Sequence, residues 1–261
     1  MNNSAVLREK LKQYAVKYCI KNQITNITQR ESAIIFNDIA DNFHPDSYDS
    51  IIKNPAYKNR LVKIHTHFYN DTKELQSSNS SDALLMNIFC HPKVKNSWKG
   101  IKDLFNLSTF GTIEFGFNPK IEVNTGHHTE IDMKISDENQ CIICEAKLTE
   151  SDFTNKDLAS FKAQYPCADG ILNLEKLETD DGTKIDNYQL IRNIIAADKY
   201  NCRFILILHS ERTDLIRKLY IVKDAVKKSS LRDNISFITW QEIANVLGKD
   251  IQDFLKLKYG I

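Results

Sequence analysis

Apolar residues occupy every second position between Glu130 and Ile135, in the middle of the chain. A period of two residues is typical of a β-strand with one buried face. A polar tip follows at residues 136–140, and the apolar run 141–144 that comes next is typical of a central strand covered on both faces. The pattern therefore predicts a β-hairpin whose second strand lies inside a sheet.

Helical spacing dominates the rest of the chain. Apolar residues three and four positions apart predict helices over residues 4–21, 30–42, 81–89, 101–106, 155–164, 186–199 and 240–258. Extended patterns predict further strands over residues 112–117, 204–208 and 235–240. Strands that alternate with helices indicate the α/β class.

The sequence between these elements shows no sign of a domain boundary. No Gly/Pro-rich linker and no internal repeat interrupts the sequence. We therefore expect a single domain over residues 1–261. It consists of a helical N-terminal lobe at residues 1–75, a core at residues 76–250 and a C-terminal helix at residues 251–261.

Two acids and a lysine meet at one end of the predicted hairpin. Antiparallel pairing sets Asp132 opposite Cys144 or Glu145, and directly opposed residues have Cα atoms about 4.5–5.5 Å apart. Lys147 lies two residues beyond Glu145, on the same face of the strand. Two carboxylates at this spacing can share one Mg²⁺ ion, and a lysine beside them can stabilise charge on a phosphoryl group. The pattern predicts a metal-dependent phosphodiesterase site.

A simpler interpretation of the same residues remains open. An acid two residues before a lysine occurs three times in the chain, so the triplet alone is weak evidence. The alternative is an exposed hairpin whose polar face carries ordinary solvated charges. What favours the catalytic site is the combination of a buried-strand pattern with an aspartate at hairpin distance upstream.

The spacing resembles the motif of the PD-(D/E)XK nuclease superfamily: Asp132, twelve intervening residues, then Glu145-Ala146-Lys147. Ile131 stands where the motif has its proline, a departure that many members share. Further similarity to a subgroup of bacterial restriction endonucleases comes from residues 80–87, 129–130, 147–150 and 188–193. The resemblance implies a restriction-endonuclease-like fold, with a mixed central β-sheet flanked by helices and a helical N-terminal lobe.

Site residues follow from the resemblance position by position. It implies that Asp132 and Glu145 are metal ligands, that the backbone carbonyl of Ala146 is a further ligand, and that Lys147 is the catalytic lysine. Many relatives add an upstream glutamate, for which Glu114 is the best match; the alternative is a surface acid on an edge strand. The implied cofactor is Mg²⁺, with Mn²⁺ as a substitute.

Four accessory candidates complete the predicted site: Asn87, Glu150, Gln189 and Arg192. Gln189 and Arg192 share one helix flank with Asn193, from which they could reach phosphate or a metal-bound water. Each accessory candidate has a structural alternative. Asn87 could serve packing, Glu150 could begin the next turn, and the helix residues could tie loops.

Composition and charge add few constraints. Hydrophobic residues make up 42% of the 261-residue chain and charged residues 26%, which is ordinary for a globular protein large enough to bury a core. No run of about 18 apolar residues and no signal-peptide pattern is visible, so we expect no membrane span and a cytoplasmic location with reduced cysteines. The two cysteines of Cys141-x-x-Cys144 should face opposite sides of the strand, and this arrangement argues against a metal site formed by the pair.

The net charge of +1 identifies no partner, although basic residues gather at residues 8–21, 93–102 and 217–232. His65 and His67 lack a third ligand nearby in the sequence. Our first hypothesis is a Mg²⁺-dependent endonuclease that hydrolyses DNA, in a restriction or genome-defence role that comes from the resemblance alone. The alternatives are a non-catalytic nucleic-acid-binding or assembly protein on the same fold, and a nuclease of RNA or branched DNA. A homodimer is expected, because cutting both strands of a duplex commonly needs two sites.

Overall fold

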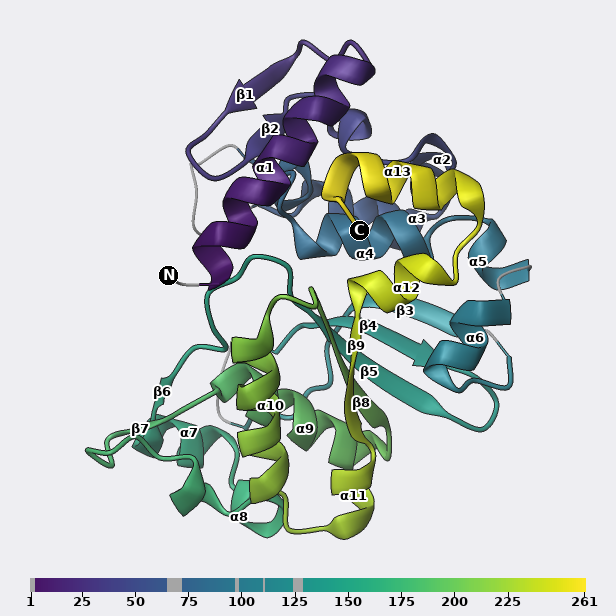
Figure 1. Ribbon diagram of the computed structural model, residues 1–261. Helices are drawn as coiled ribbons and strands as arrows, with labels where there is room; N and C mark the ends of the chain where they lie inside the picture. Colours follow the sequence, from purple (N-terminus) through teal and green to yellow (C-terminus); the bar gives the residue numbers. More distant parts are fainter. Residues whose placement is uncertain (1–2, 65–71, 97–98, 110, 124–128) are drawn as a thin grey trace.

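A mixed five-stranded sheet forms the centre of the computed structural model, which describes residues 3–64, 72–96, 99–109, 111–123 and 129–261 (Figure 1). The strand order is β3 (Thr112–Phe117), β4 (Ile131–Ser136), β5 (Cys141–Ala146), β8 (Arg203–Leu208) and β9 (Ile235–Thr239). Strands β3, β4 and β5 are antiparallel, whereas β5, β8 and β9 are parallel. The predicted α/β fold with a mixed central sheet flanked by helices is confirmed.

The predicted hairpin is formed by β4 and β5, with Met133 paired to Cys144 and Ser136 paired to Cys141. The N–H of Asp137 donates to the carbonyl of Gln140 across the turn at 3.0 Å. Continuing this register by one pair sets Asp132 opposite Glu145. The register thus decides between the two partners that the sequence left open for Asp132.

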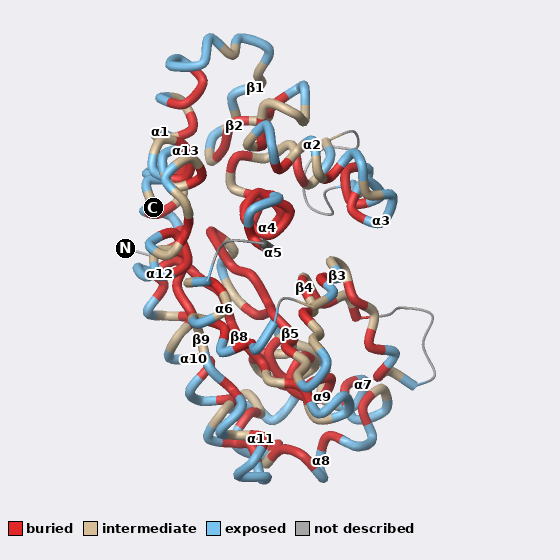
Figure 2. The backbone as a smooth tube through the Cα atoms, turned by 90° about the vertical axis from the view of Figure 1, so that its right-hand side faces the viewer, coloured by how far each residue is buried: buried red, intermediate tan, exposed pale blue. Residues whose placement is uncertain are grey.

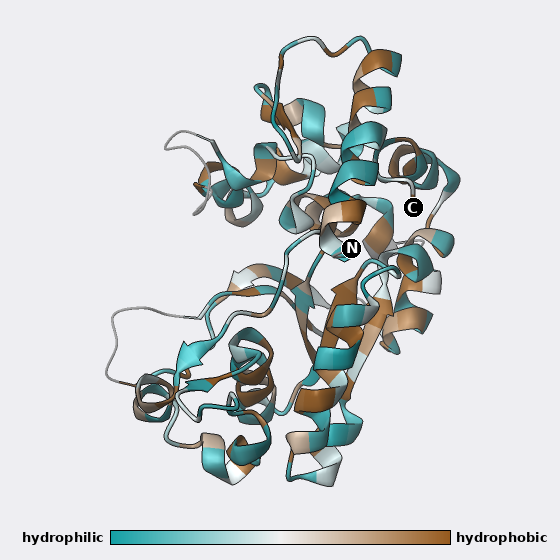
Figure 3. Cartoon of the chain, turned by 60° about the vertical axis from the view of Figure 1, so that its left-hand side comes forward, coloured by the Kyte–Doolittle hydropathy of each residue, from teal (hydrophilic) through white to brown (hydrophobic). Residues whose placement is uncertain are grey.

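Alternate residues of the strands feed two separate hydrophobic cores, one on each face of the sheet. One face is covered by α1 (Asn3–Lys21), α4 (Ser81–Phe89), α6 (Lys99–Phe105), α12 (Trp240–Asn245) and α13 (Lys249–Tyr259). The other face is covered by α7 (Leu158–Gln164), α8 (Ala168–Ile171), α9 (Tyr188–Tyr200), α10 (Thr213–Ala225) and α11 (Ser229–Asp233). The apolar strands lie between these polar-surfaced helices in Figure 3. A two-stranded sheet, β6 (Lys156–Asp157) with β7 (Lys184–Ile185), and a 3-10 helix, Leu174–Lys176, lie in the loops before α9.

The N-terminal lobe closes over one end of the sheet, and α13 returns to pack beside α1 (Figure 1). Its smaller elements are β1 (Ile27–Gln29), β2 (Ile34–Phe36), α2 (Pro45–Lys53), α3 (Pro55–Lys58) and three 3-10 helices, Ile39–Asn42, Asn59–Val62 and Glu74–Gln76. The short helix α5 (Lys93–Asn96) follows α4. Helix α4 is buried on all sides between this lobe and the sheet (Figure 2). It therefore connects the lobe to the strand ends.

One predicted helix is wrong. Residues 30–42 do not form a helix; they contain strand β2 and a short 3-10 helix. Ile34 and Phe36 are fully buried while Ile35 between them is partly exposed, so the buried positions have a period of two. The β-branched residues of this segment suit an extended pair with β1. Pro45 does not end a helix but begins α2, with His44 as its N-cap.

The boundaries of another helix also moved. The predicted helix at residues 155–164 begins at Leu158, because residues 156–157 pair with β7 and the Asp157 side chain caps α7 by accepting the N–H of Ser160. The helices predicted at residues 4–21, 81–89, 101–106 and 186–199 are confirmed as α1, α4, α6 and α9.

The cysteines depart from the expected reduced state at one pair. Cys141 and Cys202 form a disulfide between the starts of neighbouring strands β5 and β8, with Cα atoms 4.5 Å apart. Cys144 is a free, buried thiol on the other face of β5, as the strand period predicts. Within the described ranges no helix has the length and apolar character needed to span a membrane. His65, His67 and Trp98 lie outside the described residues.

Candidate active site

The predicted site residues gather at the carboxyl ends of the parallel strands, and we call this end of the sheet the sheet edge. Glu145 is the fifth residue of β5, and Lys147 directly follows that strand. Asp132 is the second residue of β4, which runs antiparallel to β5, so it lies at the same edge. Carboxyl ends of parallel strands next to an open edge are a common position for binding sites in α/β proteins.

Glu145 and Lys147 form a buried ion pair. The Lys147 Nζ lies 3.0 Å from the Glu145 Oε1, and the two residues are only 5% and 3% exposed. Helix α9 supports both side chains: the Asn193 amide donates to the Glu145 Oε2 at 2.7 Å, and Lys147 donates to the Gln189 Oε1 at 3.0 Å. Burial alone would lower the pKa of Lys147, but the surrounding carboxylates, Glu145 first, outweigh it and raise that pKa. Lys147 is therefore an ammonium group at neutral pH.

Asp132 accepts the backbone N–H of Ala146 through its Oδ2, at 2.7 Å. Burial raises the pKa of Asp132 well above its usual range, and the carboxylates of Glu145 and Asp82 raise it further. Lys147 and the Ala146 N–H lower it, but not enough to balance the acids. Burial and the neighbouring acids therefore favour the protonated form of Asp132, and a bound cation would favour its carboxylate.

Asp82 also lies at the site, although the sequence pattern assigned no role to its carboxylate. It lies in the first turn of α4, which Ser80 caps by accepting the N–H of Ala83 at 3.1 Å. Asp82 is 4% exposed, and its charge acts on Asp132. The available signal was its place in the residue 80–87 segment that carried the resemblance, but sequence spacing cannot show that this helix points at Asp132.

Two cations hold Asp82 in place. Arg60 donates to the Asp82 Oδ2 at 2.6 Å, and Lys63 lies 3.5 Å from the same oxygen. Both also pair with Glu130, at 3.0 and 2.7 Å, and Lys63 pairs with Glu74 at 3.0 Å. Although burial lowers the pKa of each cation, their acidic neighbours raise it above the usual value. Arg60 and Lys63 thus neutralise Asp82 from the side of the N-terminal lobe.

Glu150 joins the site loop to α4. It accepts the N–H of Leu148 and the hydroxyl of Ser81, each at 2.6 Å. Its charge also raises the pKa of Lys147. Glu150 therefore lies beside the site, where it fixes the turn after Lys147 to the start of the helix that carries Asp82.

Other candidates lie apart from this cluster. Glu114 is exposed on the edge strand β3, where it pairs with Lys134, two residues or about 7 Å along β4 from Asp132. Within the described part of the chain, no hydrogen bond or ion pair joins Glu114 to the site. Asn87 is fully buried and accepts the N–H of His44 at 2.6 Å, so it ties α4 to the lobe. Arg192 donates to the carbonyl of Glu130 at 3.3 Å.

The backbone at Lys147 is anchored by strand β8 and helix α12. The N–H of Lys147 donates to the carbonyl of Ile207 at 2.7 Å, and the indole N–H of Trp240 donates to the Lys147 carbonyl at 3.0 Å. Two residues later, the carbonyl of Thr149 accepts the Ser4 hydroxyl at 2.7 Å and the Arg8 guanidinium at 3.0 Å. Helix α1 is thereby fastened to the loop that follows the site.

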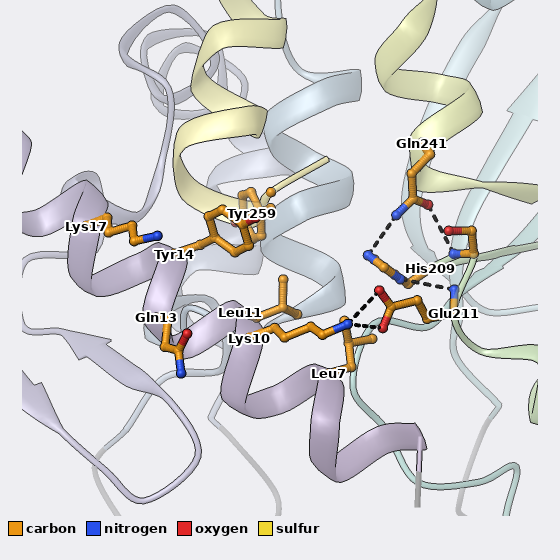
Figure 4. A pocket seen from close by; sticks show the side chains of 12 residues that line it. Leu7, Lys10, Leu11, Gln13, Tyr14, Lys17, His209, Glu211, Gln241 and Tyr259 are labelled. Atoms are coloured by element: carbon orange, nitrogen blue, oxygen red, sulfur yellow. Dashed lines mark hydrogen bonds and ion pairs between the residues drawn. The ribbon is translucent and has the colours of Figure 1, made fainter.

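A cavity of about 340 Å³ lies next to these anchors, between α1 and the ends of β8 and β9 (Figure 4). Lys10 reaches across it to Glu211 at 2.8 Å, and the Gln241 amide lies 2.7 Å from the His209 ring. Lys17 also lines it. The cavity places part of the N-terminal basic region at the same edge of the sheet as the carboxylates.

The donor set at Asp132 and Glu145 suits a hard cation. Both residues offer carboxylate oxygens, which Mg²⁺ prefers. The N–H and C=O of one residue in a strand point to the same side. Since the N–H of Ala146 faces Asp132, its carbonyl faces the same gap. Oxygen donors from two strands, two carboxylates among them, fit a Mg²⁺ or Mn²⁺ ion.

Comparison with known proteins gives one match. A family model described as restriction endonuclease associating with ARP covers residues 7–260. No curated protein and no solved structure matches the chain. The matched range covers most of the N-terminal lobe, the whole core and every residue of the cluster at the sheet edge.

Proposed function

The chain belongs to the family of restriction endonucleases associating with ARP, and we propose that it is a metal-dependent endonuclease that hydrolyses phosphodiester bonds of DNA. The observation that carries this proposal is the convergence of Asp132, Glu145 and the Lys147 ammonium at one strand edge. A binding module has no need of buried like charges, which cost stability. We further propose that its role is restriction or another form of genome defence.

Asp132, Glu145 and the carbonyl of Ala146 would hold the metal, Mg²⁺ or Mn²⁺. A divalent ion in such a site lowers the pKa of bound water and offsets charge on the phosphate. Asp132 gives up its proton when it becomes a ligand, because only the carboxylate binds well. Asn193 keeps one Glu145 oxygen engaged and so fixes the rotation of that carboxylate.

Lys147 would act on the substrate phosphate as a cation. Its ammonium is held between Glu145 and Gln189, each at 3.0 Å, so it is already oriented before substrate arrives. A preorganised donor costs little reorganisation when charge develops in the transition state. Because its pKa is raised, Lys147 would stabilise phosphate oxygens and orient the attacking water rather than accept a proton.

Substrate DNA would approach from the edge where basic side chains of α1 and α10 flank the site loop. Arg8 contacts Thr149, Lys10 and Lys17 line the neighbouring cavity, and Lys218 of α10 pairs with Asp152. Phosphate contacts of this kind supply most of the affinity for a duplex and make it depend on salt. We expect two chains to act together on a duplex, as a homodimer.

The test is cleavage of supercoiled plasmid, linear duplex, single-stranded DNA and RNA by the purified protein with Mg²⁺, Mn²⁺ or EDTA. We expect metal-dependent cutting of DNA that Lys147→Ala and Asp132→Ala each reduce by about 10²–10⁴-fold. Glu138→Gln is the matched control, because Glu138 is an exposed acid at the tip of the same hairpin. It should cut like the wild type.

Three outcomes would overturn parts of the proposal. Cutting of RNA in preference to DNA would replace the substrate class and keep the chemistry. Cutting that survives both substitutions would place catalysis elsewhere. Absence of cutting on every substrate, together with metal-independent DNA binding, would make the chain a binding or assembly protein on this fold.

A further inference from the structure

A second group of metal-ligand side chains lies where the start of α2 meets the segment after α4. His44, Asp46 and His91 each offer one ligand atom, and these atoms all lie within 4.8 Å of one another. Among the residues with described positions, this is the one set of three or more His, Cys, Asp or Glu side chains with that property. We propose that it binds a borderline divalent cation, of which Zn²⁺ is the type.

This group is separate from the carboxylates at the sheet edge. His91 follows the C-terminal end of α4, whereas Asp82 lies in the first turn of the same helix. A helix of nine residues is about 13 Å long. The two sites would therefore lie at opposite ends of α4, and neither shares a ligand with the other.

The spacing of the two imidazole rings suits coordination to one ion. Their centroids are 5.0 Å apart. A metal–nitrogen bond of about 2.0–2.1 Å and a tetrahedral angle place the centroids of two bound rings about 5 Å apart. The His91 Nε2 lies 3.7 Å from the Asp46 Oδ2, while two ligands of tetrahedral zinc lie about 3.3 Å apart. This pair would approach by only about 0.4 Å, and all the ligand atoms already lie within 4.8 Å of one another.

Nitrogen donors decide which cation this site takes. The sheet-edge cluster offers oxygen alone, which suits Mg²⁺, whereas two imidazoles and a carboxylate suit Zn²⁺ and its neighbours such as Co²⁺. Neutral imidazole nitrogens are common ligands of such cations. Asp250 in the first turn of α13 lies 3.7 Å from the His91 Nε2 and is a candidate fourth ligand.

Binding has two local costs, and both are small. The Nδ1 atoms of His44 and His91 accept backbone N–H groups at 3.3 and 3.4 Å, which is longer than the usual 2.7–3.2 Å. Coordination through Nε2 would give up these weak contacts. Asp250 would also have to share its charge with Lys93, its partner at 2.5 Å. In return, one ion would link α2, the segment after α4 and α13.

The experiment uses the untagged full-length chain, stripped with EDTA and titrated with Co²⁺ and then Zn²⁺. We expect one Co²⁺ per chain with the strong visible absorption of a tetrahedral site, displaced by Zn²⁺. His44→Asn retains a side chain that caps α2, and Asp46→Asn changes only an exposed carboxylate, so both variants should fold. Each should weaken Co²⁺ binding at least about tenfold.

Glu145→Gln is the control, because it alters the proposed nuclease site and leaves the histidine group intact. It should bind Co²⁺ with the wild-type spectrum. Tetrahedral Co²⁺ absorption that survives both His44→Asn and Asp46→Asn would overturn the proposal, whereas Co²⁺ held by the oxygen donors of Asp132 and Glu145 would lack that absorption. Absence of saturable Co²⁺ binding by the wild type, or loss of the tetrahedral spectrum in Glu145→Gln alone, would also overturn it.

Discussion

Two lysine side chains are almost completely buried in different parts of the molecule, and their surroundings have opposite effects on them. Lys147 at the sheet edge is 5% exposed, and Lys258 in α13 is 1% exposed. Carboxylates surround Lys147 and raise its pKa despite burial. Burial lowers the pKa of Lys258 well below its usual value, because only Cys19 and Asp41 oppose that effect.

Aromatic rings supply most of the environment of Lys258. Its Nζ lies 4.9–5.3 Å from the centroids of four rings, those of Tyr18, Phe36, Phe254 and Tyr259. It also donates to the carbonyl and the side-chain oxygen of Asn42. These contacts join α13 to the N-terminal lobe. Both lysines are buried, and it is the neighbouring carboxylates that distinguish Lys147, the one we propose to be catalytic.

The largest difference between variants of the two lysines should appear in the rate of DNA cleavage. We expect Lys147→Met to lower the rate of DNA cleavage by about 10³-fold, because the oriented cation beside the carboxylates is lost. Lys258→Met should cut within about twofold of the wild type, since its side chain faces the packed lobe. Rates under single-turnover conditions with Mg²⁺ measure this. Equal losses in the two variants would mean that Lys147 serves folding rather than chemistry.

The free energy of unfolding should change in opposite directions in Lys147→Met and Lys258→Met. Lys147→Met leaves the buried Glu145 carboxylate without its cation, and removing one partner of a buried pair costs about 3–5 kcal/mol. Lys258→Met replaces a buried charge with an apolar side chain of similar length, which we expect to raise the free energy of unfolding. Thermal and urea unfolding without metal check both signs. A lower melting temperature for Lys258→Met would show that the bonds to Asn42 outweigh desolvation.

Substitution of Asn193 tests whether the orientation of the Glu145 carboxylate, the partner of Lys147, matters for metal binding. Asn193→Ala removes the 2.7 Å bond to the Glu145 Oε2 and should weaken Mg²⁺ binding by about 10–100-fold, a typical cost of losing a residue that orients a metal ligand. The Mg²⁺ concentration needed for half-maximal cleavage measures it. Asn139→Ala, at the exposed hairpin tip, is the control. An unchanged Mg²⁺ requirement would leave Asn193 only a packing role.

The smallest expected effect is a pH dependence. Lys258 has a folded pKa below its unfolded value of about 10.4, so it releases a proton on folding and its penalty disappears as pH rises toward that value. The stability gained by Lys258→Met should therefore shrink as the pH rises from neutral toward about 10.4. The raised pKa of Lys147 keeps its contribution intact over this range. Melting temperatures across the range test this; a constant gain would mean that Lys258 does not titrate there.

The sequence by itself determined the hairpin and three of its polar residues. Alternation between Glu130 and Ile135 and the apolar run after the tip specify two paired strands, because side chains alternate between faces with a period of two. Pairing within one hairpin then brings Asp132 to Glu145 without any long-range contact. Lys147 follows from its spacing along the same strand.

Only the tertiary structure decided what joins that hairpin from elsewhere. Asp82 reaches the site, and Glu114 does not, because α4 docks with its first turn toward Asp132 while β3 pairs Glu114 with Lys134. His44 and His91 meet across 47 residues, and Cys141 bonds to Cys202, through packing that no local pattern encodes. Residues 34–36 form a strand because they pair with β1 and bury alternate side chains, a period of two that the helical interpretation missed. Periodicity reports which face of an element is buried, but only the docking of elements fixes which side chains share a site.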